Sequence, residues 1–169
     1  MEHTLLKAKA WHIFIILSIS YFISWFVKDG ELKDMMKLLG FCIFCIWLGV
    51  LGNTLNQLEE GGQERSASRF VFDIFFVIAA FALSKILANP DFDISPNSFH
   101  ANGLWSIPMI YSLVAYIQIH WFPASILVAN EQGHKPDFSQ ILGTFILLFF
   151  WPAGIWLMQP RLNRIYNAV

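Results

Sequence analysis

Residues 10–27 read AWHIFIILSISYFISWFV, a run that contains no Asp, Glu, Lys or Arg. Trp11 and Trp25 bracket it, roughly 21 Å apart along a helix, as aromatic residues do at the two membrane interfaces. The stretch from Trp11 to Leu17 does not alternate between apolar and polar residues, as the strands of a transmembrane barrel do. Strands of soluble parallel sheets also use apolar runs, but of about 4–8 residues. A helix satisfies its own backbone amides in lipid, so the run predicts a transmembrane helix.

Four further apolar runs of similar length follow. They cover residues 36–55, 70–87, 104–129 and 141–158. Together the five runs predict an all-α fold: a polytopic, integral membrane helical bundle of about five transmembrane segments, forming one domain over residues 1–169. The last run carries Trp151-Pro-Ala-Gly154 near its middle, a kink or turn signal. We expect this segment to span the membrane, and re-entry is the alternative.

The composition excludes several other classes of protein. The chain has 169 residues, of which 56% are hydrophobic and 14% charged, against about 25% charged residues in average soluble domains. So few charges cannot supply the polar shell of a soluble domain of this size. A formal net charge of −1 gives no field of one sign, so we expect no nucleic-acid partner. The partner that composition predicts is the lipid bilayer.

The orientation in the membrane depends on the last segment, because cytoplasmic loops carry an excess of Lys and Arg. If all five segments cross the membrane, five basic residues lie on one side and six on the other. This count does not favour either orientation. If residues 141–158 re-enter, Arg161 and Arg164 change sides, the division becomes seven against four, and the N-terminus is cytoplasmic. The seven are then Lys7, Lys9, Arg65, Arg69, Lys135, Arg161 and Arg164, and the four are Lys28, Lys33, Lys37 and Lys85.

Two stretches resemble a known group of proteins. Residues 149–165, FFWPAGIWLMQPRLNRI, contain a pattern Pro-x-Gly-Ile-Trp-x-x-Gln-Pro-Arg, and residues 5–14 read LLKAKAWHIF. Both are similar to the ends of a family of small polytopic membrane proteins of bacteria, mainly of the Bacteroidetes, that has no assigned activity. The chain departs from the family where Ala10 replaces the His expected beside Trp11. The resemblance implies a bacterial, multi-pass protein, for which we expect the inner membrane.

The most polar part of the predicted helices lies in residues 104–129. Ser112, Tyr116 and His120 are spaced four apart and form one stripe. Such a stripe must face protein or water, so it predicts a polar pocket or proton path, or else hydrogen bonds between helices. Asp73 is a further candidate for this pocket, because an ionisable side chain within a span marks a transport path. A pair with Arg69 near the headgroups is its alternative.

Two groups of side chains have the residue types of metal or redox sites. Cys42 and Cys45 share a helix face, which suits a redox or soft-metal pair or the packing of small core residues. Asp91, Asp93 and His100 in the polar connection 89–103 suit a surface cation or a solvated loop. Neither group supplies a full set of ligands for a metal ion or a redox centre, so we expect no metal site and no cofactor.

Two arginines, Arg161 and Arg164, follow the last apolar run. Pro160 suits the first position of a short helix, on which Arg161 and Arg164 would share a face at the bilayer surface. Guanidinium groups bind phosphates bidentately, so these residues are candidates for lipid-headgroup binding, with a simple membrane anchor as the alternative.

These patterns lead to one functional hypothesis and two alternatives. We expect a non-enzymatic inner-membrane protein, a structural or accessory subunit, which forms a homo-oligomer or binds another membrane protein. A small transporter or oligomeric channel would use the polar residues of 104–129 with Asp73. A lipid-modifying membrane enzyme would draw on His120, Arg161 and Arg164.

Overall fold

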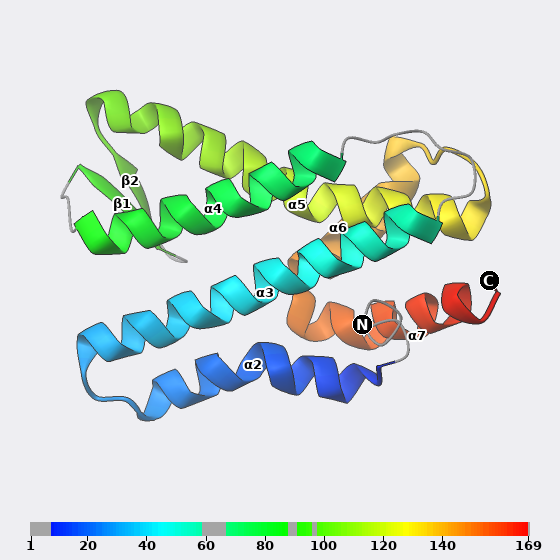
Figure 1. Cartoon of the computed structure of the whole chain (residues 1–169), viewed down its shortest axis with the longest axis horizontal. Coiled ribbons are helices and arrows are strands. Elements are labelled where there is room, and N and C mark those ends of the chain that lie inside the picture. Colours follow the sequence, from blue (N-terminus) through cyan, green and yellow to red (C-terminus); the bar gives the residue numbers. More distant parts are fainter. Residues whose placement is uncertain (1–7, 59–66, 88–90, 96–97, 169) are drawn as a thin grey trace.

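The computed structural model describes residues 8–58, 67–87, 91–95 and 98–168, and almost all of them are helical (Figure 1). The all-α prediction is confirmed. The elements are α2 (Ala10–Phe26), α3 (Gly30–Leu58), α4 (Ala67–Leu87), β1 (Phe92–Ser95), β2 (Ser98–Ala101), the 3₁₀ turn η1 (Gly103–Trp105), α5 (Ser106–Gln132), α6 (Phe138–Phe149) and α7 (Trp151–Ala168). Lys7 and Arg65, which enter the charge count, lie outside the described residues.

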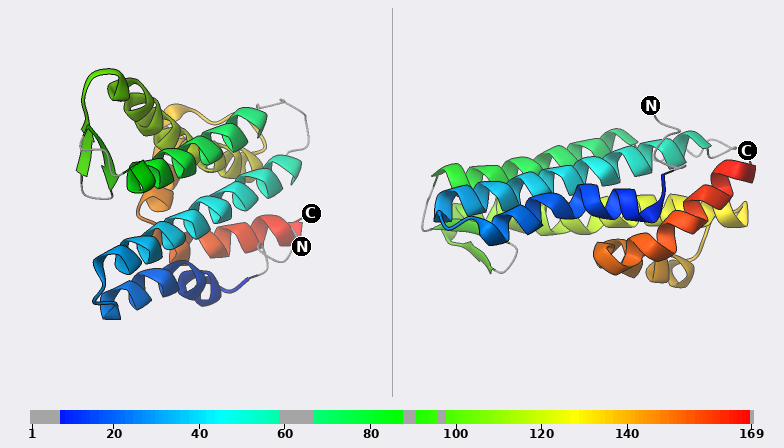
Figure 2. Two further views of the ribbon diagram at one scale, coloured as in Figure 1. Left: turned by 60° about the vertical axis from the view of Figure 1, so that its left-hand side comes forward. Right: turned by 90° about the horizontal axis from the view of Figure 1, so that it is seen from below.

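Helices α2 to α5 run back and forth along the long axis of the molecule (Figures 1 and 2). Helix α3 contacts α2, α4 and α5, while α6 packs on α5 and α7 packs on α6 and α2. The C-terminal end of α7, the end of α3 and the end of α5 lie at one end of the bundle, which we call the termini end. The turn between α2 and α3 and the two strands lie at the opposite end.

The core and the surface are both apolar. Leu48, Leu51 and Leu55 of α3 and Ile119 of α5 are fully buried. The outer faces carry exposed aliphatic and aromatic side chains, such as Phe75, which is 68% exposed. Among the described residues, three helices are long and apolar enough to cross a membrane: Gly30–Leu58, Ala67–Leu87 and Gly103–Gln132. Helices α2 and α6 are apolar but shorter.

The segment predicted at 141–158 is not one helix. Helix α6 ends at Phe149, Phe150 leaves helical geometry with φ −94° and ψ 53°, and α7 begins at Trp151. Pro152 falls in the first turn of α7, where its missing N–H costs no hydrogen bond. Gly154 follows, and a Cβ there would collide with the backbone carbonyl of Leu147. The two helices therefore meet at a contact that only glycine permits.

The prediction for Pro160 was wrong. This residue stands inside α7, which continues to Ala168, and does not begin a short separate helix. The helix thus extends ten residues beyond the end of the apolar run, because the run ends where polar residues begin while the helical backbone continues.

The connection 89–103 holds structure that the sequence analysis did not predict. Strands β1 and β2 pair antiparallel, with Phe92 opposite Ala101. The backbone N–H of Ile94 donates to Oγ of Ser84 on α4 at 2.7 Å. Phe92 and Ile94 are buried against the end of α4. This small sheet therefore covers one end of the bundle.

Candidate functional site

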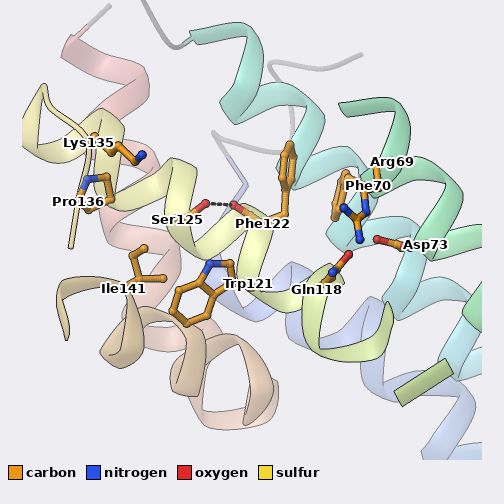
Figure 3. A pocket seen from close by; sticks show the side chains of 10 residues that line it. All are labelled: Arg69, Phe70, Asp73, Gln118, Trp121, Phe122, Ser125, Lys135, Pro136 and Ile141. Atoms are coloured by element: carbon orange, nitrogen blue, oxygen red, sulfur yellow. Dashed lines mark hydrogen bonds between the residues drawn. The ribbon is translucent and has the colours of Figure 1, made fainter. Parts of the chain in front are cut away.

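A groove of about 460 Å³ lies over one face of α5, near the start of α4 and the start of α6 (Figure 3). We call it the α5 groove. Its lining combines aromatic rings, two cations, one carboxylate and two neutral polar side chains. The lining residues are Arg69, Phe70, Asp73, Gln118, Trp121, Phe122, Ser125, Lys135, Pro136 and Ile141.

Helix α5 supplies the floor. Gln118, Trp121, Phe122 and Ser125 follow one another at intervals of three, one and three residues, the spacing of a single helix face. The stripe covers roughly 10 Å of helix axis. A ligand in the groove would therefore lie along the helix and contact an amide, two rings and a hydroxyl in turn.

A tight turn brings the second wall back over this floor. Helix α5 ends at Gln132 and is capped by Gly133, whose φ of 70° is the left-handed conformation that glycine adopts without strain. Helix α6 begins after Asp137, whose backbone N–H donates to the side chain of Gln140 at 2.7 Å in a capping box. Lys135 and Pro136 lie between these two signals and are fixed beside α5. Asp137 is the N-cap residue of α6.

Aromatic stacking holds the wall formed by α4. The rings of Phe70 and Phe122 stack with centroids 4.3 Å apart. Gly52 on α3 allows this arrangement, because a Cβ there would lie 2.6 Å from Cε1 of Phe70. On the other wall Trp121 stacks on Phe138 at 5.0 Å. Stacked ring pairs therefore support the groove on both sides.

The charges of the groove lie at its two ends. Asp73 is only 1% exposed and accepts a hydrogen bond from the Tyr111 hydroxyl at 2.7 Å. Figure 3 shows Arg69, Asp73 and Gln118 pointing toward one another at one end, and Lys135 at the other. The two cations and one carboxylate leave one net positive charge. The sequence analysis singled out Asp73, but it did not predict that Lys135 and Trp121 would lie in the same groove.

The predicted stripe of Ser112, Tyr116 and His120 does not line this groove. Ser112 donates to the carbonyl of Pro108 at 2.7 Å. Nδ1 of His120 lies 2.8 Å from the carbonyl oxygen of Tyr116. Because a carbonyl only accepts, Nδ1 carries the proton. These two side chains therefore bond to the backbone of their own helix.

His120 is nevertheless unusual. Its ring is fully buried, and Nε2 has no hydrogen-bond partner in the described part of the chain. Phe44, Tyr116, Phe145 and Phe149 surround the ring with centroid distances of 4.7–6.4 Å. Such aromatic packing favours a neutral imidazole enclosed in the core.

Arg161 lies at the termini end, where three helices meet. Its Nε donates to Glu131 at 2.7 Å, its Nη2 also binds that carboxylate, and its Nη1 donates to Thr144 at 3.0 Å. Arg164, the second headgroup candidate, is exposed. Arg161 therefore joins α5, α6 and α7, while the Arg164 guanidinium is open to a ligand.

The two redox candidates are not joined to each other, and the two carboxylates among the metal candidates have other partners. Cys42 and Cys45 are both free thiols, and Cys45 is buried. Asp93 forms an ion pair with Lys85 at 3.0 Å, and Asp91 accepts from Asn102 at 3.2 Å. Within residues 8–58, 67–87, 91–95 and 98–168, no group of three or more His, Cys, Asp or Glu side chains is arranged to hold a metal ion.

Comparison of the chain with models of protein families, with curated proteins and with solved structures gave no match.

Proposed function

We propose that this chain is a non-enzymatic, multi-pass protein of the bacterial inner membrane that serves as a structural or accessory subunit. The observation that carries this proposal is the apolar outer surface of the bundle. Ile16 on α2, Phe75 on α4 and Ile107 on α5 are 57%, 68% and 69% exposed. Large exposed apolar surfaces mark contact with lipid or with another protein. The resemblance of residues 149–165 to bacterial membrane proteins supports the cellular location.

In this proposal α2, α3, α4 and α5 cross the membrane, and α6 and α7 form a re-entrant hairpin. Helix α6 has 12 residues and measures roughly 18 Å, less than the ~30 Å of a bilayer core. The contact of Arg161 with Glu131 supports this arrangement, because it brings α7 back to the end of α5. The C-terminus then lies on the same side as the N-terminus.

Re-entry favours a cytoplasmic location for the termini. With Arg161 and Arg164 on the side of the N-terminus, seven basic residues stand there against four on the opposite side. The positive-inside rule assigns the richer side to the cytoplasm. The small sheet of β1 and β2 then faces the periplasm.

A subunit role is supported by how the polar groups of the bundle are used. Ser112 and His120 bond to the backbone of α5, and Arg161 binds Glu131 and Thr144. Ser112 and His120 are thus satisfied within their own helix, while Arg161 joins α5, α6 and α7 and stabilises a fixed shape. A fixed shape with an apolar outer surface suits a protein that docks against another membrane protein or a second copy of itself.

Mild extraction and reconstitution test this function. The tagged chain, extracted from its host membrane in a gentle detergent, is expected to co-purify with a stoichiometric membrane partner or as a defined homo-oligomer. Liposomes that contain the purified chain are expected to conduct no ions and to leave lipid headgroups unchanged. A chain that stays monodisperse in buffer without detergent would overturn the membrane assignment, and solute flux or headgroup turnover would overturn the subunit role.

One observation favours a small transporter as a second candidate. Asp73 is a buried carboxylate that lines an open groove and binds a tyrosine of the neighbouring helix. Intramembrane carboxylates of this kind occur on ion and substrate paths. Flux into liposomes that disappears in Asp73→Asn, but persists in a matched Asp29→Asn variant at the exposed turn before α3, would select this candidate.

A further inference from the structure

We propose that the α5 groove binds a flat, lipid-soluble carbonyl compound of the quinone class. One carbonyl oxygen of the ligand accepts a hydrogen bond from the side-chain amide of Gln118, and the other accepts from the indole N–H of Trp121. The apolar tail of the ligand leaves the groove toward the bilayer. This inference rests on the proposed crossing of the membrane by α5, and it adds a ligand to the subunit role.

Gln118 places an amide near the middle of α5. It lies twelve residues after Ser106 and fourteen residues before Gln132, the two ends of the helix, which corresponds to roughly 18 Å and 21 Å along the axis. The side chain is half-buried and lines the groove, and its amide forms no hydrogen bond with the residues that the structure describes. Lipid tails offer no hydrogen-bond partner at this depth, so the amide requires one from a ligand or from another protein.

Trp121 supplies a second donor about one helical turn from Gln118. Its side chain is half-buried, and its indole N–H also forms no hydrogen bond within the described part of the chain. Side chains three residues apart on one helix face have Cβ atoms roughly 5–6 Å apart. A six-membered ring with carbonyl groups on opposite sides has a similar width. One ring can therefore accept from both donors.

The other polar groups at this part of the groove already have partners. The Ser125 hydroxyl donates to the backbone of its own helix at 2.9 Å, and Arg69 also has an interaction partner. The Asp73 carboxylate is 1% exposed and accepts from a tyrosine of α5. Gln118 and Trp121 are therefore the two donors that a ligand meets here.

The groove has the size and the lining for a flat ring. Its volume of about 460 Å³ lies within the roughly 300–1,000 Å³ range of small-molecule sites. The rings of Phe70 and Phe122 stack on one side, and Phe138 stacks on Trp121 on the other. Flat conjugated rings pack well against such aromatic side chains. The floor is enclosed between α4 and the start of α6 (Figure 3), so it admits a small molecule more readily than a whole helix.

The depth of Gln118 favours a quinone over a phospholipid. The phosphate and ester groups of a phospholipid lie at the membrane interface, so near the middle of the bilayer a phospholipid offers only hydrocarbon. A quinone ring carries two carbonyl acceptors and no charge, so it enters hydrocarbon far more easily than a charged headgroup does. Phe72 and Leu142, which are 57% and 39% exposed, continue the apolar surface beside the groove. The tail of the quinone can lie there among neighbouring lipids.

Binding of a quinone to the full-length chain tests this proposal. The purified chain in delipidating detergent receives a methylnaphthoquinone with a farnesyl tail, farnesol, which has the same tail without the ring, or phosphatidylglycerol. Native mass spectrometry counts the bound ligand during a titration, and thermal unfolding follows stabilisation. We expect one quinone per chain, bound at least about tenfold more tightly than either comparison compound.

Variants of the two donors test the site itself. Gln118→Leu removes the amide, and Trp121→Phe keeps an aromatic ring but removes the N–H. Each is expected to weaken quinone binding about three- to tenfold, the effect of losing one neutral hydrogen bond. Gln132→Leu and Trp156→Phe are the matched controls and are expected to bind as wild type does, because both residues are exposed and lie outside the lining. Gln118→Met replaces Gln118→Leu if leucine prevents folding.

Four results would overturn the proposal. The first three are equal affinities of wild type for the quinone and farnesol, tighter binding of phosphatidylglycerol than of the quinone, and equal quinone affinities of wild type and both donor variants. The fourth is a Gln118 variant that loses self-association while quinone binding is unchanged, which would assign the amide to a contact with a second copy. The subunit role stands in all four cases, since solute flux, headgroup turnover or solubility without detergent would refute it instead.

Discussion

Arg161 on α7 and Glu131 at the end of α5 form a bidentate ion pair across 30 residues of sequence. Both side chains are about three quarters buried, with 25% and 26% of their surface exposed. Paired planar groups of this kind combine charge with fixed geometry. The pair therefore anchors the far end of the α6–α7 hairpin to the main bundle.

The planar arrangement of donors on the Arg161 guanidinium is expected to contribute more to stability than its charge does. Arg161→Lys keeps the charge but cannot bind Glu131 through two nitrogens and Thr144 through a third. We expect a loss of about 1–3 kcal/mol in the free energy of unfolding, measured in detergent with a chemical denaturant. Arg164→Lys, at an exposed position of the same helix, is the control and is expected to change stability by less than about 0.5 kcal/mol. Equal stability of the two variants would contradict the structural role of the pair.

The crossing of α6 and α7 is expected to tolerate no side chain at residue 154. In Gly154→Ala the new methyl group would collide with the carbonyl oxygen of Leu147, a backbone atom that cannot rotate away. We expect destabilisation of about 3 kcal/mol, at the upper end for overpacking, and a lower midpoint of thermal unfolding.

Gly143→Ala provides the matched control for this crossing. Gly143 lies inside α6 with nothing within 4 Å of a built Cβ. Alanine there is expected to stabilise the helix by about 0.5–1 kcal/mol. If both alanine variants stabilise the protein, the close approach of the two helices is refuted.

The Tyr111 hydroxyl is expected to be coupled to the Asp73 carboxylate. Tyr111→Phe removes the donor at 2.7 Å and leaves a buried acceptor without it. We expect a loss of about 1–3 kcal/mol in wild type. The loss should be smaller in the Asp73→Asn background, where the acceptor carries no charge. A double-mutant cycle of unfolding free energies measures the difference, and additive effects would show that the two side chains act independently.

Thiol labelling tests the re-entrant hairpin. In a variant that lacks Cys42 and Cys45, single cysteines replace Gln132, Asn167 or Asn102. An impermeant reagent applied to intact spheroplasts is expected to label Asn102→Cys alone, because the other two positions face the cytoplasm. Permeabilised cells should show labelling at all three positions. If Asn167→Cys labels in intact spheroplasts while Gln132→Cys does not, the final segment crosses the bilayer.

The helices nearest to uniform apolar runs were predicted well. The run at 10–27 became α2 at Ala10–Phe26, and the run at 70–87 became α4 at Ala67–Leu87. Length and hydropathy are enough to predict these helices, because a backbone in lipid must form its hydrogen bonds within its own helix. Helix α3 begins six residues before the run at 36–55, at Gly30. Polar residues such as Asp34 and Lys37, which pair at 3.0 Å, continue a helix that hydropathy alone does not detect.

Other features depended on tertiary contacts that the sequence does not encode locally. The turn signal at Trp151–Gly154 predicted a kink or turn, and α6 and α7 do separate there, but the extension of α7 through Pro160 was not predicted. Asp73 drew attention as a charge within an apolar run. Lys135 lies 66 residues from Arg69 in the sequence, and no periodicity connects two residues on different elements. Their meeting in one groove follows only from how α4 and the start of α6 pack on α5.

The way α6 and α7 attach has a consequence for biosynthesis. No Asp, Glu, Lys or Arg stands between Asp137 and Arg161, so both helices can leave the insertion machinery together as one uncharged unit. Glu131 emerges from the ribosome 30 residues before Arg161, so this partner is absent until those residues have been made. The pair can therefore close only after α6 and the first part of α7 have been made, so the hairpin attaches after the helices of the main bundle have left the ribosome.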